Sequence, residues 1–294
     1  MWRNESSFIY LYRQILNKGY IYNKLLFMIS LMQLLKEVQG TPKAIILAGA
    51  PGAGKGFILK GLDLGGLKIF NLDNTFIDLL KQANISLDLK SLGPEDRSAA
   101  AQAMVQATSK LKKETIPQAI ANQESFILDG TASSVKQTSE LKSELENAGY
   151  EVFMLYVYTD LERALQQNQD RFEKSGGTDR SLAPAIVLRT WAEVTKNYNI
   201  YKSMFGNNFV SISNTLKDEK LKDLESIVDK YLKPFSPQDT KEKNPKAQAR
   251  AKKAREQLSQ EVSTLLQDEG VANIINNSVS KEEAQSKIQQ FLSK

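Results

Sequence analysis

Short apolar runs alternate with longer amphipathic stretches along most of the chain. Such brief, bounded runs are typical of buried strands in a parallel sheet, and we predict strands at residues 44–48, 67–72, 125–129, 151–158 and 208–212. Helical patterns follow each run, at residues 55–61, 72–83, 94–122, 135–148, 161–170, 184–205 and 216–232. The alternation predicts an α/β fold: a five-stranded, mostly parallel sheet with helices on both faces.

Local signals refine this pattern at three places. Pro117 predicts a kink or a break in the helix over 94–122. Residues 172–183 are rich in Gly, Ser and Arg and predict a mobile loop. On the helix over 184–205, a stripe of apolar side chains (Trp191, Val194, Tyr198 and Tyr201) predicts core packing.

The two ends of the chain differ from this middle part. We expect an N-terminal helical extension (residues 1–40), a central α/β domain (41–235) and a basic helical C-terminal tail (236–294). The run Leu25–Leu35 is too short to span a bilayer, and a short helix is expected at Ile29–Val38. Residues 241–255 hold seven basic residues against one acid, and helices are predicted at Pro245–Gln267 and Lys281–Leu292, with few core residues.

Composition narrows the chemistry. The 294 residues include no Cys and no His, so thiolate catalysis, disulfides, Cys/His zinc sites and histidine acid–base catalysis are excluded. Any general base must therefore be a carboxylate, and any metal site must be rich in oxygen ligands. The net charge of +5 is mild and compatible with phosphorylated substrates.

The first predicted strand runs into a glycine-rich sequence, GAPGAGKG, which continues into a helix. Glycines let the backbone curl so that successive N–H groups face one anion, and the helix N-terminus adds its positive end. Lys55 is expected to reach the β- and γ-phosphates. The Ser or Thr that normally follows, and helps to hold Mg²⁺, is replaced by Gly56. The expected nucleotide site comprises Gly49, Ala50, Pro51, Gly52, Ala53, Gly54, Lys55, Gly56 and Phe57.

Two carboxylates end later strands, where open α/β sheets place ligands. Asp73 is expected to accept the proton of an acceptor hydroxyl, with Asn74 as the neighbouring alternative; its other reading is a helix N-cap. Asp129 is expected to hold a magnesium-bound water and, with Thr131, to contact the acceptor; its other reading is a turn residue capping the next helix.

Three arginines lie in or beside the expected loop. Arg171 and Arg180 are candidates to neutralise charge on the transferring phosphoryl group, and Arg189 is a weaker candidate for binding the substrate. The alternative for each is a solvated surface charge.

Together these motifs resemble the zeta-toxin-like P-loop kinases, especially the versions in tailed-phage genomes. The likeness covers about residues 41–214 and depends on GAPGAGKG (49–56), NLDNTF (71–76), ILDGT (127–131), Arg171, the stretch from Arg180 to Val194, and NNFVSISN (207–214). It implies ATP-dependent phosphorylation of a hydroxyl, with Lys55 on the phosphates and Arg171 and Arg180 on the γ-phosphate. Zeta toxins phosphorylate a UDP-linked amino sugar and pair with an antitoxin; neither property is carried over.

We therefore expect an ATP- and Mg²⁺-dependent kinase that transfers the γ-phosphate to a hydroxyl or phosphate of a small molecule or nucleotide, is located in the cytoplasm and has no membrane partner. One alternative is a polynucleotide 5′-hydroxyl kinase whose basic tail binds nucleic acid or a protein. Another is a non-enzymatic nucleotide-binding accessory protein of a phage particle, since residues 28–40 resemble the leaders of internal capsid proteins.

Overall fold

The computed structural model describes residues 40–64, 66–89, 91–215, 245–267 and 269–293. The helices predicted at Ile29–Val38 and Leu216–Leu232 lie outside these ranges. Residues 43–293 form one compact unit, to which the following description applies. No helix in the described part of the chain is both long and apolar enough to cross a membrane.

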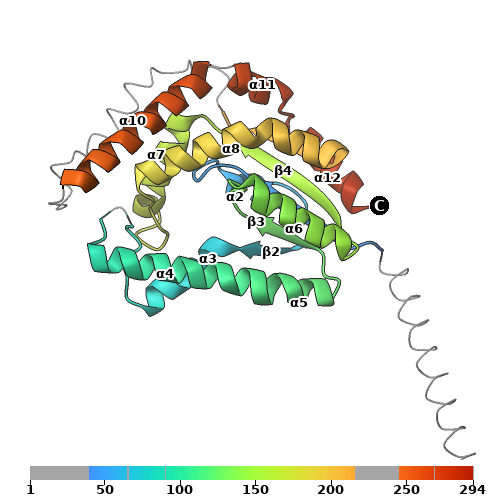
Figure 1. The fold of residues 1–294 in the computed structure, drawn as a ribbon. Coiled ribbons are helices and arrows are strands. Elements are labelled where there is room, and N and C mark those ends of the chain that lie inside the picture. The colour runs from blue at the N-terminus through green and yellow to red at the C-terminus, as the bar shows by residue number, and fades with distance from the viewer. Residues whose placement is uncertain (1–39, 65, 90, 216–244, 268, 294) are drawn as a thin grey trace, which may run out of the picture. The chain divides into compact units, whose positions relative to one another are not determined.

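The centre of this unit is a sheet of five parallel strands in the order β2-β3-β1-β4-β5 (Figure 1). The strands are β1 (Lys43–Ala48), β2 (Lys68–Asn71), β3 (Phe126–Asp129), β4 (Glu151–Tyr158) and β5 (Phe209–Ser213). All four strand pairs are parallel, so the predicted strands and the predicted α/β fold are confirmed. The register sets Asn71 at the end of β2 beside Asp129 at the end of β3.

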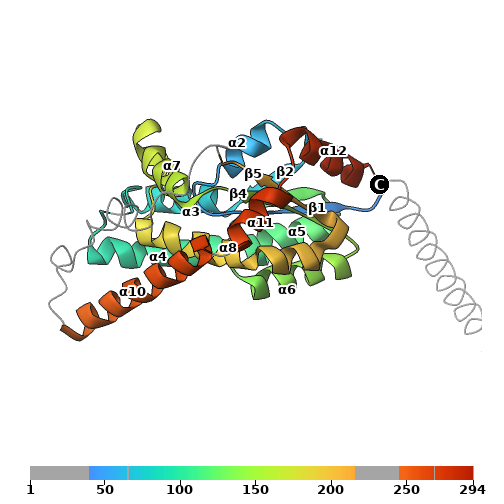
Figure 2. The ribbon, with the colours of Figure 1, turned by 90° about the horizontal axis from the view of Figure 1, so that it is seen from above.

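Helices cover both faces of the sheet, as predicted. Alternate residues of β1 face opposite cores: Ala44 and Ile46 pack with α5, α6, α8, α10 and α11, whereas Ile45 and Leu47 pack with α2 and α12 (Figure 2). The helices are α2 (Lys55–Lys60), α3 (Leu72–Gln82), α4 (Pro94–Lys110), α5 (Ile116–Ala121), α6 (Val135–Asn147), α7 (Leu161–Lys174), α8 (Pro184–Phe205), α10 (Pro245–Gln267), α11 (Glu269–Asn277) and α12 (Lys281–Leu292).

Pro117 does not end its helix. A π-helical segment, Leu111–Thr115, joins α4 to α5 directly before it. Proline lacks an N–H, and in a regular α-helix its ring meets the carbonyl four residues earlier. A π turn changes that spacing, so the segment 94–121 continues through the proline.

Helix α7 ends four residues later than predicted. Asp170 accepts hydrogen bonds from Gln166 and from Lys174, each four residues away. Such i,i+4 pairs stabilise a helix whose sequence looks like a polar loop. The loop predicted to begin at Phe172 therefore begins at Ser175.

The C-terminal helices contribute to both cores, contrary to the expectation that they are poor in core residues. Apolar side chains of α12 recur at the spacing of one helical face, and Phe291 lies 5.0 Å from Phe153 of β4, centroid to centroid. Val279, just before α12, donates its N–H to the carbonyl of Ser211 in β5 at 2.8 Å. The predicted boundary at residue 235 falls outside the described residues and stays a prediction. Among the side chains of this part that the structure describes, the buried ones are Val262, Val271, Ile274, Ala284, Ile288 and Phe291.

Candidate active site

The glycine-rich loop that follows β1 has the backbone geometry of an anion cradle. Gly52 and Gly54 have φ values of 79° and 81°, which L side chains rarely adopt. A Cβ on Gly52 would lie 2.2 Å from the carbonyl oxygen of Ala164, and one on Gly54 would lie 2.3 Å from Nδ2 of Asn214. Both positions therefore require glycine, as the motif predicts.

Contacts from three other segments hold this loop in place. Asn214, after β5, donates through Nδ2 to the carbonyl of Ala53 at 3.0 Å. Gly49 donates its N–H to the carbonyl of Thr131, after β3, at 3.1 Å. Gln167 on α7, with its amide turned to match its neighbours, donates to the carbonyl of Gly52 at 2.6 Å. The loop is thus fixed before any ligand enters.

The other members of the predicted loop divide by exposure. Ala50, Pro51 and Ala53 are buried, so they contribute backbone rather than side chains. Gly56 supplies no hydroxyl, and Phe57 is 71% exposed on the first turn of α2.

Lys55 lies over the loop that it is predicted to serve. Its Nζ donates to the carbonyls of Gly49 at 2.9 Å and Ala50 at 3.1 Å. Burial lowers the pKa of Lys55, and the nearby charges of Asp129 and Asp73 act in the opposite direction. An anion that binds beside a partly desolvated ammonium group stabilises its charged form, and a phosphate is such an anion.

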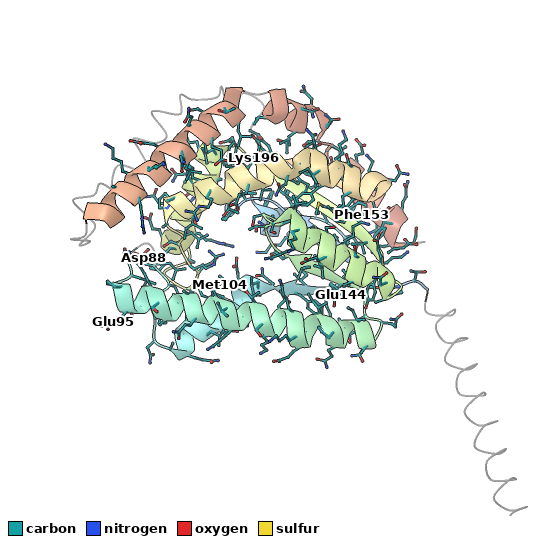
Figure 3. All side chains as sticks on the ribbon, viewed as in Figure 1. Asp88, Glu95, Met104, Glu144, Phe153 and Lys196 are labelled. Carbon is teal, nitrogen blue, oxygen red and sulfur yellow. The ribbon has the colours of Figure 1, made fainter. Side chains whose placement is uncertain are left out.

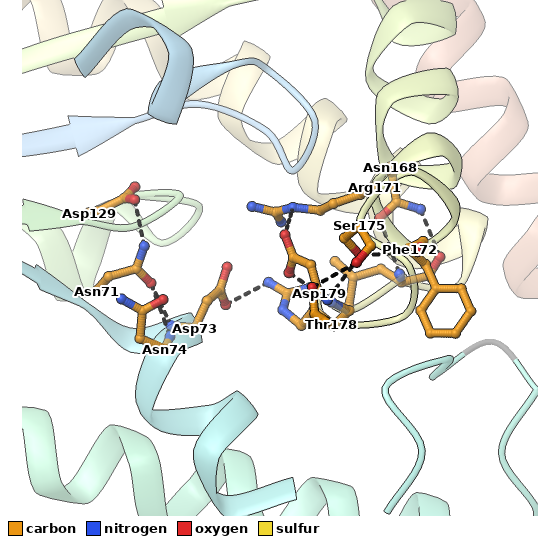
Figure 4. Close-up of polar contacts among 12 residues, drawn as sticks. Asn71, Asp73, Asn74, Asp129, Asn168, Arg171, Phe172, Ser175, Thr178 and Asp179 are labelled. Atoms are coloured by element: carbon orange, nitrogen blue, oxygen red, sulfur yellow. Dashed lines mark hydrogen bonds and ion pairs between the residues drawn. The ribbon is translucent and has the colours of Figure 1, made fainter. Parts of the chain in front are cut away.

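Asn71, which the sequence analysis left without a role, joins the two candidate carboxylate segments (Figure 4). Its Oδ1 accepts from the backbone N–H groups of Asp73 at 2.7 Å and Asn74 at 3.4 Å, so Asn71 caps α3. Its Nδ2 donates to Oδ2 of Asp129 at 2.7 Å. The amide orientation is unique, because exchanging the two atoms would lose both sets of contacts. The N-cap pattern N-x-D-N at the strand end was the signal that could have identified it.

Neither aspartate has the capping role that was its alternative reading. Asn71 caps α3 in place of Asp73, and Ser134 caps α6 by accepting from the N–H of Gln137 at 3.3 Å. Burial raises the pKa of Asp129, and the hydrogen bond from Asn71 acts against this shift. The carboxylates of Asp73 and Asp129 therefore do not serve as helix caps and can contact a ligand.

Arg180 reaches the predicted proton acceptor. Its Nη2 lies 2.5 Å from Oδ1 of Asp73, and its side chain is only 7% exposed. Nε and Nη1 of this guanidinium are buried and have no hydrogen-bond partner. Buried donors are normally paired, so two unpartnered donor nitrogens on a fixed cation indicate a place for an anion.

The other two arginines differ. Arg171, on α7, pairs through Nε with Oδ2 of Asp179 at 2.8 Å (Figure 4). Its charge is close enough to lower the pKa of Lys55, which places it in the electrostatic field of the loop.

Arg189 is exposed on α8, and the structure does not bring it to the contacts described above. Asn74 is exposed beside Asp73, and Thr131 contributes its carbonyl to Gly49.

Figure 3 gives the distribution of side chains over the unit. In the described residues, no group of three or more carboxylates gathers at one point. A magnesium ion bound with a nucleotide needs only one or two carboxylates besides phosphates and water. Asp129, oriented by Asn71, fits that requirement, whereas Gly56 lacks the hydroxyl that often assists.

A parallel sheet in this strand order, with a glycine loop and a lysine at the end of β1, defines a P-loop kinase-type nucleotide-binding protein. The zeta toxin family model matches residues 31–202, more than half of the chain, so the chain belongs to the zeta toxin family. A search of curated proteins finds no significant match.

Solved structures show looser likenesses. A candidate kinase from Chloroflexus aurantiacus is 17% identical, with a TM-score of 0.42, over 65% of this chain and 96% of that one. The structure described for the PezAT toxin–antitoxin system of Streptococcus pneumoniae is 14% identical, with a TM-score of 0.41, over 78% and 88%. AvrRxo1-ORF1:-ORF2 with ATP is 19% identical, with a TM-score of 0.44, over 63% and 58%. Because these TM-scores lie below 0.5, the assignment depends on the family model and the geometry above.

Proposed function

We propose that this chain is an ATP-dependent phosphotransferase that moves the γ-phosphoryl group to a hydroxyl of a small molecule or nucleotide. One observation carries the proposal: a buried arginine with two unpartnered donor nitrogens binds the carboxylate of Asp73, beside a lysine held over a phosphate-type loop. The family assignment supports the reaction class.

Roles follow from the contacts. The loop N–H groups and Lys55 bind the β- and γ-phosphates. Arg180, with Arg171 nearby, neutralises charge on the transferring group. The acceptor oxygen bonds to the γ-phosphorus as the bond to the β–γ bridging oxygen breaks, Asp73 takes the hydroxyl proton, and ADP leaves.

Asp129 would hold Mg²⁺ through water, and the ion would neutralise phosphate charge. We propose that Asn74 and Thr131 contact the acceptor, and we assign Arg189 no step.

A matched pair of lysine variants tests this proposal. Lys55→Met removes the ammonium but keeps the stem, whereas Lys60→Met makes the same change at an exposed position on the same helix, α2. We expect Lys55→Met to lose phosphoryl transfer by about 10²-fold or more, since it removes charge stabilisation at the phosphates. Lys60→Met should retain wild-type turnover.

The assay is transfer of radiolabelled γ-phosphate from ATP, with Mg²⁺, to UDP-sugars, nucleoside monophosphates, oligonucleotides and water. Near-normal turnover by Lys55→Met would overturn the proposed role of the loop. Failure of the wild-type protein to bind ATP or GTP would overturn the function as a whole.

The oligonucleotide arm also tests the polynucleotide alternative. On α10, the side chains of Arg250, Lys252 and Lys253 are exposed, although Lys252 lies 4.0 Å from Glu256. A 5′-hydroxyl oligonucleotide preferred over small acceptors, with an affinity that falls steeply with salt, would favour that alternative. The tailed-phage origin, association with a virion and cytoplasmic location stay predictions without a test in the structure.

A further inference from the structure

The segment that carries Arg180 is tied down on both sides of that residue. Arg180 donates its own N–H to Oδ1 of Asp179 at 2.7 Å, and Leu182 donates its N–H to Oδ1 of Asn168 on α7 at 3.1 Å. Between them, Ser181 donates its N–H to the carbonyl of Leu87 at 3.1 Å. The N–H groups of Ser181 and Leu182 are thus held by two distant parts of the chain, and that of Arg180 is held by its neighbour Asp179, which pairs with Arg171 on α7.

One of these ties includes a side-chain contact that the catalytic roles above do not use. The hydroxyl of Ser181, which is fully buried, lies 2.6 Å from Oδ1 of Asp88 in the connection between α3 and α4. The other oxygen, Oδ2 of Asp88, accepts from the hydroxyl of Ser91 at 2.6 Å. Asp88 and Ser181 also form a parallel β-bridge. We call the Asp88–Ser181 contact the clasp.

The connection on the far side of the clasp is itself fixed. Leu87 and Leu92, on either side of Asp88, are buried in the core that joins α3 and α4. Asp73 lies at the start of the same α3. The clasp therefore joins the backbone beside Arg180 to the connection that follows α3, the helix whose first turn carries Asp73.

We propose that Ser181 and Asp88 are positioning residues, which hold Arg180 against Asp73 with its remaining N–H groups free for the phosphoryl group. The reason is geometric. The Asp73 contact restrains only one end of a long side chain, so the location of residue 180 must be set through the backbone. A misplacement of about 1 Å at a reacting group costs up to about 10²-fold in rate. The role in catalysis depends on the proposed function, whereas the role in placing Arg180 does not.

The test compares Ser181→Ala with Ser91→Ala. Both remove a hydroxyl that donates to the same carboxylate, but only Ser181 adjoins Arg180. We expect Ser181→Ala to lower kcat for ATP turnover by about tenfold to a hundredfold while the affinity for a fluorescent ATP analogue stays unchanged, because the misplaced group acts in the transition state. Ser91→Ala should retain wild-type kcat.

A double variant separates positioning from general damage. In an Arg180→Ala background, Ser181→Ala should produce no further loss, since the residue through which it acts is gone. An equal loss in both backgrounds, or an equal loss in Ser91→Ala, would overturn the proposal.

A measurement without turnover separates this proposal from the proposed function. The Nε–H signal of Arg180 in a ¹⁵N spectrum, assigned by its absence in Arg180→Lys, should shift and exchange faster with water in Ser181→Ala and stay unchanged in Ser91→Ala. An unchanged signal in Ser181→Ala would overturn the clasp even if the wild-type protein transferred phosphate. A shifted signal in a protein without turnover would retain the clasp and overturn the proposed function.

Discussion

At the residue scale, carboxylates and cations offset one another in the site, and Arg171 is itself paired with Asp179. Asp73 binds Arg180, Asp129 accepts from Asn71, and Lys55 is lowered in pKa by burial although both acids oppose that shift. Arg180 keeps two donors unused in this arrangement. A phosphate would satisfy these donors and favour the charged form of Lys55, so the separate features all point to an anion of high charge.

Asp129 leads to a prediction about pH. Its pKa is raised in the folded state, so the folded protein binds this proton more tightly than the unfolded chain does, and the ionised carboxylate opposes folding at neutral pH. The wild-type protein should therefore lose stability as the pH rises through the window from the ordinary value of 3.8 to the raised one. We expect Asp129→Asn, which keeps an acceptor for Asn71, to be more stable than the wild-type protein at pH 7 and equal to it below that window.

Urea unfolding at a series of pH values measures this difference. The same variant should lose phosphoryl transfer, because a neutral amide lacks the negative charge with which the carboxylate attracts a hydrated magnesium ion. A variant less stable than the wild-type protein at pH 7 would show that Asp129 contributes to folding rather than opposing it.

At the scale of elements, the loop between β1 and α2 depends on backbone conformations with positive φ, which residues with a side chain rarely adopt. Gly52→Ala would place its Cβ against the carbonyl of Ala164 in a left-handed conformation. We expect a loss of about 1–3 kcal/mol in the free energy of unfolding, together with a loss of ATP binding.

The matched control is Gly56→Ala, four residues along the same loop and helix. A Cβ there meets nothing within 4 Å, and its φ is not positive. Since alanine favours helices over glycine by up to about 1 kcal/mol, this variant should be neutral or slightly more stable. Thermal unfolding and nucleotide titration compare the two; equal behaviour would show that the loop conformation adjusts to a side chain.

At the scale of the whole unit, the C-terminal helices complete the cores on both faces of the sheet. Phe291 is buried against Phe153 of β4, at the far end of the sequence from the loop that binds the nucleotide. We expect Phe291→Ala to lower the free energy of unfolding by about 3–5 kcal/mol, because it leaves a cavity beside the sheet.

Ile275→Ala on α11 serves as the control, since Ile275 is 41% exposed. Its cost should stay within about 0.5 kcal/mol. Chemical denaturation of both variants measures the difference. A small effect of Phe291→Ala would mean that residues 281–293 are a dispensable tail after all.

The sequence alone determined the parts of this protein that depend on local chemistry. Period and length of the apolar runs predicted every strand, and glycine spacing predicted the loop, because both depend on a few neighbouring residues. Helix α8 and helix α10 were predicted to the residue, since Pro184 and Pro245 mark their starts.

Tertiary structure decided what depends on residues far apart in the chain. Asn71 gained its second contact because two parallel strands end side by side, 58 residues apart in sequence. Arg180 contacts Asp73, and Ser181 contacts Asp88, because the connection between α7 and α8 packs against α3 and the connection that follows α3. The apolar faces of α11 and α12 found their partners only on the assembled sheet. A sequence gives the residue types that can make such contacts, but the folded backbone decides which of them come within bonding distance, since hydrogen bonds and ion pairs act over only a few ångströms.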